Sequence, residues 1–423
     1  MRSAIRWNLL MVVVAALGAM AVGQTESTLF TFTETGNFWP LGGFVEDASG
    51  NLYGATKGGG TYGAGTVYEM SPPTKSGGSW TEKTLYSFPT FGNGGYIPSS
   101  EVIMDAAGNL YGTTWAGGDS VCNCGTVYEL VKPTTGGAWT ETVLYNFTAV
   151  NEDGRLPNSQ MTMGANGTIY GVTQQGGAYN SGTIFQLAPG TGGTYTESVL
   201  YSFGNLEDAD TPNGPMVMDA SGALYGVTSL GGTLGDGAVY KFVPGTNGNP
   251  GTETVLYSFG GGKSSSYGDT PVGNLVFDSA GNLYGVTNAG GNSSSDGIVY
   301  ELSPATGSWT EKVLYTFNKN SGISPQGGLA WNATSSALYG TTTNQNGLTT
   351  GSGSVFQLTA PTTKGGAWTE STLFQFTYAG NGGYPTGHIL VDPTSGTLYG
   401  TASQGGVRNC DLFCGVVWQI VNP

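Results

Sequence analysis

The sequence predicts an all-β chain that closes into a seven-bladed β-propeller with four antiparallel strands in each blade. Three observations lead to this fold class: a high glycine content, a sequence repeat of about 57 residues, and the way the first and last repeats complement each other. Of the 423 residues, 74 are Gly and only 10% are charged, whereas 38% are hydrophobic and 12% aromatic. A chain with this apolar content packs a core, and its glycine content indicates many turns.

Three short sequence words recur seven times each, and each is typical of a β-strand because β-branched and aromatic residues are bounded by Gly, Asn, Asp or Pro. The words are Thr/Ser-x-Leu-Tyr/Phe-x-Phe, Leu/Ile-Tyr-Gly and Gly-x-Val/Ile-aromatic. The leucines of the first word are Leu29, Leu85, Leu144, Leu200, Leu256, Leu314 and Leu373. The tyrosines of the second are Tyr53, Tyr111, Tyr170, Tyr225, Tyr284, Tyr339 and Tyr399. The glycines that open the third are Gly65, Gly125, Gly182, Gly237, Gly297, Gly353 and Gly415.

A fourth, less regular strand is expected just after a proline in each repeat, for example at Gly43–Val45, Val102–Met104, Leu275–Phe277 and Ile389–Val391. Several strands are apolar at consecutive positions, so both faces of each small sheet are expected to be buried. Four-stranded sheets that pack face to face around an axis satisfy this condition. A linear solenoid needs polar capping repeats at its ends, and neither terminal repeat has that character.

The two ends of the repeat series predict how the ring closes. The chain that remains after export would begin with the outer-strand word at Thr28–Phe32, and it ends with the third word at Gly415–Ile420. The last repeat therefore lacks an outer strand that the N-terminus can supply. This pairing would close residues 24–423 into a single domain and remove a free sheet edge.

The repeated wording resembles the bacterial GloVer tandem repeat. The resemblance rests on strings such as Asp278–Thr287, Gly290–Gly291, Gly297–Leu302 and Val255–Phe259, and it extends over residues 25–420. It implies a propeller-like repeat fold and export from the cell. It assigns no chemistry.

The N-terminus has the order of a secretory signal peptide, which we place at residues 1–23. Arg2 and Arg6 precede the apolar stretch Leu9–Leu17, and small residues follow. The protein is therefore expected to be secreted or held at the cell surface as a monomer. No later segment reaches the 18 apolar residues of a membrane span, so we expect no transmembrane segment in the mature chain. The net charge of −15 argues against nucleic acid as a partner.

Long, variable connections fall on one face of the predicted disc, formed by the loops from fourth to first and from second to third strand. Binding residues commonly lie on such loops of a rigid scaffold. Four aromatic residues break the period and are assigned to these loops, and they are the candidates for stacking against a glycan: Trp39, Tyr96, Trp115 and Tyr384. Other tryptophans, such as Trp80 and Trp139, occupy one repeated position, which predicts packing.

The same face carries a dense run of acidic residues in the third and fourth repeats. These residues, Glu152, Asp153, Glu207, Asp208 and Asp210, are candidates to bind a cation such as Ca²⁺, because that ion takes oxygen ligands. The alternative is a solvated acidic rim. We expect no other cofactor.

The four cysteines lie as two close pairs in the second and seventh repeats. In an oxidising compartment they are expected to form two local disulfides, Cys122–Cys124 and Cys410–Cys414. The one histidine, His388, begins the inner strand of the last repeat, which is more typical of a packed residue than of a lone catalytic base. We assign no catalytic residue.

Three functional hypotheses remain open from the sequence. The first is an exported, non-enzymatic propeller that binds a glycan or another exported protein through its variable face. The second is a carbohydrate-active or calcium-dependent hydrolase with carboxylates on that face, because the separation of two carboxylates cannot be read from a sequence. The third is a structural component of the cell surface.

Overall fold

The structure is a computed structural model. It describes residues 25–33, 36–75, 77–90, 94–148, 150–204, 208–245, 251–260, 266–344, 352–363, 365–378, 380–406 and 414–421. The predicted signal peptide, residues 1–23, lies outside this part of the chain and stays a prediction.

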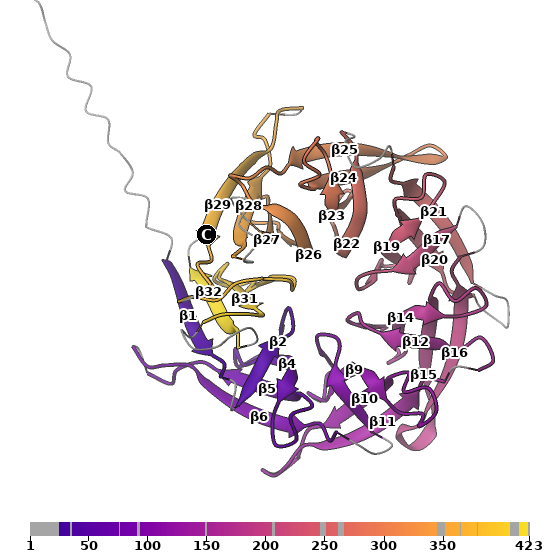
Figure 1. The fold of residues 1–423 in the computed structure, drawn as a ribbon, viewed down its shortest axis with the longest axis vertical. Coiled ribbons are helices and arrows are strands. Elements are labelled where there is room, and N and C mark those ends of the chain that lie inside the picture. Colours follow the sequence, from indigo (N-terminus) through magenta and orange to yellow (C-terminus); the bar gives the residue numbers. More distant parts are fainter. Residues whose placement is uncertain are drawn as a thin grey trace, which may run out of the picture.

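Seven antiparallel sheets form a ring, which confirms the predicted seven-bladed β-propeller (Figure 1). The inner strands of blades 1 to 7 are β2 (Asn37–Pro40) with β3 (Val45–Glu46), β7 (Gly95–Pro98) with β8 (Ile103–Met104), β12 (Gly154–Pro157) with β13 (Thr162–Met163), β17 (Ala209–Pro212) with β18 (Val217–Met218), β22 (Gly268–Phe277), β26 (Ile323–Asn332) and β30 (Leu390–Val391). The second strands are β4 (Leu52–Gly59), β9 (Leu110–Gly117), β14 (Ile169–Gly176), β19 (Leu224–Gly231), β23 (Leu283–Gly290), β27 (Ala337–Asn344) and β31 (Leu398–Ala402).

The third and outer strands complete each blade. The third strands are β5 (Thr66–Ser71), β10 (Thr126–Val131), β15 (Thr183–Pro189), β20 (Ala238–Val243), β24 (Ile298–Ala305), β28 (Ser354–Thr359) and β32 (Val416–Val421). The outer strands are β6 (Thr81–Ser87), β11 (Thr140–Asn146), β16 (Tyr195–Ser202), β21 (Thr252–Ser258), β25 (Ser308–Thr316), β29 (Thr369–Gln375) and, for blade 7, β1 (Thr25–Thr31). One 3₁₀ turn, Thr191–Gly193, interrupts this pattern, and none of the described residues forms a helix long and apolar enough to cross a membrane.

The inner strand differs from the prediction, which placed it entirely after the recurring proline. In blades 1 to 4 the strand begins before the proline, stops at it and resumes a few residues later. Blades 5 and 6 keep one continuous strand, but its register shifts between Val272 and Val276 and between Pro325 and Leu329. Proline removes a backbone donor, so the strand separates from its neighbour at this point. The freed residues lie near the axis of the ring.

β1 closes the ring as the outer strand of blade 7, which is consistent with the predicted closure. It pairs antiparallel with β32 from Thr25 opposite Val421 to Thr31 opposite Val416. The register shifts between Thr28 and Phe30, so Leu29 is bulged. In blade 1 the same shift bulges Leu85, its counterpart in the sequence word. β1 therefore has the geometry of an outer strand rather than of an added edge.

Aromatic side chains join each blade to the next. The last phenylalanine of each outer-strand word lies against the aromatic residue of the next blade's third strand, with ring centroids 5.0–6.1 Å apart. The pairs are Phe32–Tyr68, Phe88–Tyr128, Phe147–Phe185, Phe203–Tyr240, Phe259–Tyr300, Phe317–Phe356 and Phe376–Trp418. Such edge-to-face or tilted pairs stabilise beyond the apolar area they bury.

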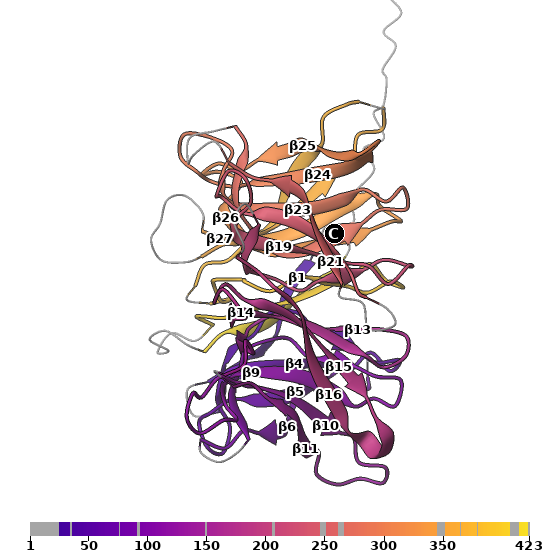
Figure 2. The same cartoon turned by 90° about the vertical axis from the view of Figure 1, so that its right-hand side faces the viewer.

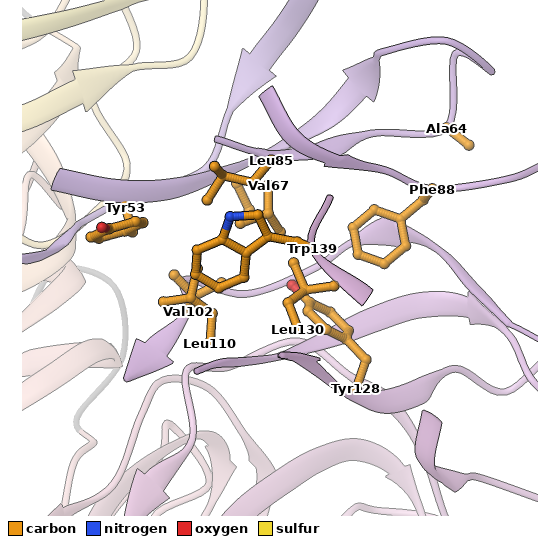
Figure 3. Close-up of a cluster of buried hydrophobic side chains, with 11 residues drawn as sticks. Tyr53, Ala64, Val67, Leu85, Phe88, Val102, Leu110, Tyr128, Leu130 and Trp139 are labelled. Carbon is orange, nitrogen blue, oxygen red and sulfur yellow. The ribbon is translucent and has the colours of Figure 1, made fainter. Parts of the chain in front are cut away.

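The core between blades 1 and 2 shows how the repeated tryptophan is used (Figure 3). Trp139, 8% exposed, packs in this cluster, and its ring centroid lies 6.4 Å from that of Tyr53 in blade 1. The predicted packing role of this position is confirmed here. Viewed from its edge, the disc carries connections on both faces (Figure 2).

The short turn between first and second strands is held by its aspartate. In blade 5 the Asp278 carboxylate accepts hydrogen bonds from the backbone amides of Ala280 (2.8 Å) and Asn282 (2.9 Å) and from the Tyr284 hydroxyl (3.0 Å). These hydrogen bonds outweigh the opposing effect of burial and lower the pKa of Asp278. The aspartate is therefore a turn-forming residue.

Replacing Asp278 with Ala is expected to lower the free energy of unfolding by about 1–2 kcal/mol, because several donors, two of them partly buried, lose their shared acceptor. Urea unfolding at neutral pH measures this change. Asp278→Asn is the matched control and should recover part of the loss, since its amide oxygen still accepts. Equal unfolding midpoints for wild type and Asp278→Ala would contradict the assignment.

Candidate functional site

The residue before the recurring proline has an unusual backbone conformation in every blade. All seven have φ between 57° and 62°: Trp39, Ile97, Leu156, Thr211, Thr270, Ser324 and Tyr384. A residue before proline normally prefers extended backbone, so this left-handed conformation costs about 1–3 kcal/mol at each position. A hydrogen bond to the preceding blade compensates, for example from the Trp39 amide to the Cys414 carbonyl (3.1 Å). The fold thus fixes the backbone here, while the side chain differs from blade to blade.

Three of these residues, Trp39, Thr270 and Tyr384, line a hollow at one end of the axis, which we call the mouth hollow, with a volume of about 540 Å³. It is lined by Trp39, Lys57, Asn158, Asn213, Thr270, Val272, Asn288, Gln326, Tyr384, Thr386, Ser403 and Gln404. Six blades contribute to this wall. The wall presents aromatic rings, amides and hydroxyls. Rings can stack on the faces of sugars, and amides and hydroxyls can form hydrogen bonds with sugar hydroxyls.

A second hollow of about 520 Å³ lies between blades 1 and 2, and we call it the side hollow. It is lined by Phe38, Trp39, Lys57, Gly58, Gly63, Ile97, Ser99, Trp115 and Asn158. Trp39, Lys57 and Asn158 belong to both hollows. Gly63 lies in a connection from second to third strand, so the hollows open on the face that the sequence analysis singled out.

Beneath the mouth hollow, a smaller axial cavity of about 180 Å³ contains an ion pair. His388 Nδ1 of blade 7 lies 2.5 Å from Glu101 Oε2 of blade 2. The other oxygen of Glu101 accepts a hydrogen bond from the Gly43 amide in the intervening blade. Burial disfavours a charged imidazole, but the Glu101 carboxylate outweighs it and raises the pKa of His388. His388 and Glu101 therefore link three blades at the axis.

Among the described residues that line the mouth and side hollows, Lys57 is the one with a charged side chain. Its Nζ lies 5.3 Å from the centroid of the Trp39 ring, within the range of a cation–π contact. Burial lowers the pKa of Lys57.

The structure brings three of the four predicted aromatic residues together. Trp39 and Trp115 line the side hollow, and Trp39 and Tyr384 line the mouth hollow. Tyr96 lies outside both linings, and its hydroxyl accepts a hydrogen bond from Asn123 (2.8 Å). The placement in loops was wrong for Trp39, Tyr96 and Trp115, which lie on β2, β7 and β9. Trp39 and Tyr96 lie on strands because the inner strand begins before its proline, and Trp115 does so because the second strand extends to Gly117.

The predicted calcium residues lie in two separate blades. The Asp153 carboxylate accepts hydrogen bonds from the Tyr145 hydroxyl (2.9 Å) and the Thr148 amide (2.7 Å). The Asp208 carboxylate accepts from the Tyr201 hydroxyl (2.6 Å) and the Ala209 amide (2.7 Å).

Asp210 accepts from the Thr211 hydroxyl, and Glu152 is exposed. Glu207 lies outside the described residues. Within the described ranges, no group of three or more His, Cys, Asp or Glu residues could hold a metal ion. Calcium binding stays a prediction that titration calorimetry would test.

Cys122, Cys124 and Cys414 lie in connections from second to third strand. Cys122 and Cys124 are bonded to each other in the structure. Cys410 lies outside the described residues, so its pairing with Cys414 stays a prediction.

The sequence analysis did not identify Lys57 or the amides that line the mouth hollow as candidate binding residues. Lys57 and Trp115 occupy one repeat position, directly after the threonine of Leu-Tyr-Gly-x-Thr. The corresponding residues elsewhere are Gln174, Ser229, Asn288, Thr343 and Ser403. This position and the two that flank the proline vary while their neighbours repeat. Such variation within a uniform repeat is the signal that could have identified the axial face.

Fold and site together define a seven-bladed β-propeller with an aromatic and amide-lined hollow at one end of its axis. Three overlapping matches to the Gloeobacter/Verrucomicrobia repeat cover residues 19–217, 76–276 and 216–420. The chain belongs to this family, which confirms the resemblance noted from its sequence words.

Comparisons with curated protein sequences and with solved structures assign no function to the chain. No curated protein sequence matches the chain. A solved structure from Thermus thermophilus, provisionally described as an oxidoreductase (glucose dehydrogenase), is 16% identical with a TM-score of 0.44. The alignment covers 94% of this chain and 100% of the other. A likeness at this level carries no inference about activity.

Proposed function

We propose that this protein is an exported, non-enzymatic propeller that binds a glycan in the mouth and side hollows. The observation that carries the proposal is the convergence of Trp39, Trp115 and Tyr384 on two adjoining hollows, of which the mouth hollow is walled by amides. Aromatic rings stack against the apolar faces of sugars, and amides can both donate to and accept from sugar hydroxyls. The predicted signal peptide would deliver the protein to where such glycans occur.

The geometry favours binding over glycoside cleavage. Cleavage by a pair of carboxyl groups requires both to face the scissile bond. The residues lining the two hollows offer rings, amides, hydroxyls and one ammonium group instead. Glu101 in the axial cavity is held by His388 and by the Gly43 amide. Release of reducing ends from a polysaccharide panel would contradict this reading and support the hydrolase alternative.

Replacing Trp115 with Ala is expected to weaken glycan binding about five- to thirtyfold, because a stacked indole contributes about 1–2 kcal/mol. Trp115 is 46% exposed, so the fold should tolerate the change. Trp39→Ala should have a similar effect on binding. Glycan arrays followed by titration calorimetry measure both variants.

Tyr179→Ala is the matched control, because Tyr179 is 51% exposed and does not line either hollow. It should bind like the wild type. Unchanged binding by both tryptophan variants would remove the glycan site from the hollows. Failure of the wild-type protein to retain any glycan would instead favour a protein partner or a structural role.

A further inference from the structure

The repeat does not require a basic residue at the position of Lys57. Lys57 is the only basic residue at its position among the seven repeats, where the others are Trp, Gln, Ser, Asn, Thr and Ser. The strand β4 that carries it has the same length as β9, β14, β19, β23 and β27. The fold therefore forms equally well around neutral side chains at this position, and the charge calls for a separate explanation.

Lys57 is a partly buried cation that faces a space a ligand can enter. Its side chain is half-buried, and its Nζ is held above the Trp39 ring at 5.3 Å from the centroid. Within the described part of the chain, no carboxylate lies within ion-pair distance of its ammonium group. Removing a charge from water without a counter-charge is unfavourable, so an anion that entered the hollow would be attracted to this group.

The other polar groups that the described residues contribute to the two hollows are neutral. The amides are Asn158, Asn213, Asn288, Gln326 and Gln404. In a protein with a net charge of −15, the hollow is thus a local positive site on an acidic molecule. Amides and hydroxyls alone would suit a neutral sugar, whereas the added ammonium group favours a sugar with a negative charge.

We propose that the glycan bound by this protein is acidic, and that Lys57 pairs with its carboxylate or sulfate group while Trp39 and Trp115 stack against its rings. This inference rests on the proposed function and narrows it to a class of ligand. An ammonium group accommodates either anion as a point charge, so the experiment must distinguish carboxylate from sulfate.

The test uses a panel of matched polysaccharides in neutral, carboxylated and sulfated forms, including polygalacturonate and its methyl ester. The full exported chain is compared with Lys57→Met, which removes the charge but keeps a flexible stem above Trp39, and with Lys57→Arg. We expect Lys57→Met to lose at least tenfold in its affinity for the acidic form relative to its affinity for the ester, because only the acidic form loses a charge partner. Lys57→Arg should retain most of the affinity, and binding of the acidic form should weaken as salt rises.

The outcomes separate the two proposals. If the wild type retains neutral glycans as well as acidic ones, and Lys57→Met changes neither, the acidic-ligand inference is overturned while glycan binding stands. If the wild type retains no member of the panel, both proposals fail together. Trp39→Ala should weaken neutral and acidic forms alike, whereas Lys57→Met should weaken the acidic forms much more than the neutral ones. Whether carboxylated or sulfated members show the loss identifies the anion.

Discussion

A chain that begins at Thr33, and therefore lacks β1, is expected to unfold or to assemble into oligomers. Removing β1 takes away the whole ladder from Thr25 opposite Val421 to Thr31 opposite Val416. It also removes Phe32, which is 1% exposed and packs against Tyr68 of blade 1 with ring centroids 5.2 Å apart. Truncating one buried phenylalanine commonly costs about 3–5 kcal/mol, and the stability of a whole domain is about 5–15 kcal/mol.

The deletion also exposes β32 as a free edge. A free edge pairs readily with another chain, so association is the expected alternative to unfolding. Thermal melting and size-exclusion chromatography with light scattering distinguish the two results.

Two controls make this experiment specific to closure. A chain that begins at Thr25 keeps β1 and should remain folded and monomeric. A peptide of residues 25–33, added to the shortened chain, should restore its melting temperature, because a missing strand can be supplied in trans. If the chain that begins at Thr33 stays monomeric and melts like the wild type, β1 does not close the ring.

The closure and the blade count could be predicted because both follow from short sequence segments. Each strand word carries its own apolar and turn residues, and the words at Thr28–Phe32 and Gly415–Ile420 complement each other. The path of the inner strand beyond its proline could not be predicted in this way. It depends on contacts between blades. The Asn274 side chain in blade 5, for example, donates a hydrogen bond to the Leu329 carbonyl in blade 6 (2.9 Å) and accepts one from the Leu329 amide (3.1 Å). Nothing in either segment alone signals that contact.

The candidate site was likewise predictable only in part. Trp39, Trp115 and Tyr384 were found because aromatic residues that depart from a repeat are conspicuous. Lys57 was missed because a polar residue on a strand is unremarkable until its neighbours are known. His388 was expected to be a packed residue, and only the ring brings Glu101, far away in the chain, to its imidazole. The role of a side chain at the axis is set by another blade.

We expect the free energy of unfolding to depend strongly on pH, because a ring of outer-strand glutamates titrates in the folded chain. Each outer strand contains Thr-Glu or its equivalent, and burial raises the pKa of all seven glutamates: Glu26, Glu82, Glu141, Glu197, Glu253, Glu311 and Glu370. Several accept a hydrogen bond from the outer-strand tyrosine of the preceding blade, as Glu141 does from Tyr86 (2.8 Å). These carboxyls therefore lie in the contacts between blades.

Three of the glutamates titrate near neutrality. Burial raises the pKa of Glu197 and of Glu311 to about 7. Burial, together with the adjacent Asp208 carboxylate, raises the pKa of Glu253 to about 8. Between pH 4.5 and 8 the folded chain keeps protons that the unfolded chain releases, so the free energy of unfolding falls as pH rises.

The turn aspartates act in the opposite direction at lower pH. Hydrogen bonds outweigh burial and lower the pKa of Asp47, Asp219 and Asp278, so their contribution is lost as pH falls below about 4. The two groups together predict a maximum of stability at about pH 4–6 rather than at neutral pH. Urea unfolding at a series of pH values measures this profile.

The variant Glu197→Gln, Glu253→Gln, Glu311→Gln should be more stable than the wild type at pH 8 and nearly equal to it at pH 5. Glutamine has the shape of a protonated glutamate, and at position 253 its amide can still donate to Asp208. Solvent reaches part of each carboxyl, so we expect about 1–2 kcal/mol from each site, and the sites are far enough apart to add.

Glu152→Gln, a change at an exposed glutamate, is the control and should keep the pH profile of the wild type. If the triple variant and the wild type lose the same stability between pH 5 and 8, the outer-strand carboxyls ionise in the folded ring without penalty. In that case the fall in stability would have to arise elsewhere, because these glutamates supply the only outer-strand groups among the described residues whose pKa is raised to between about 7 and 8.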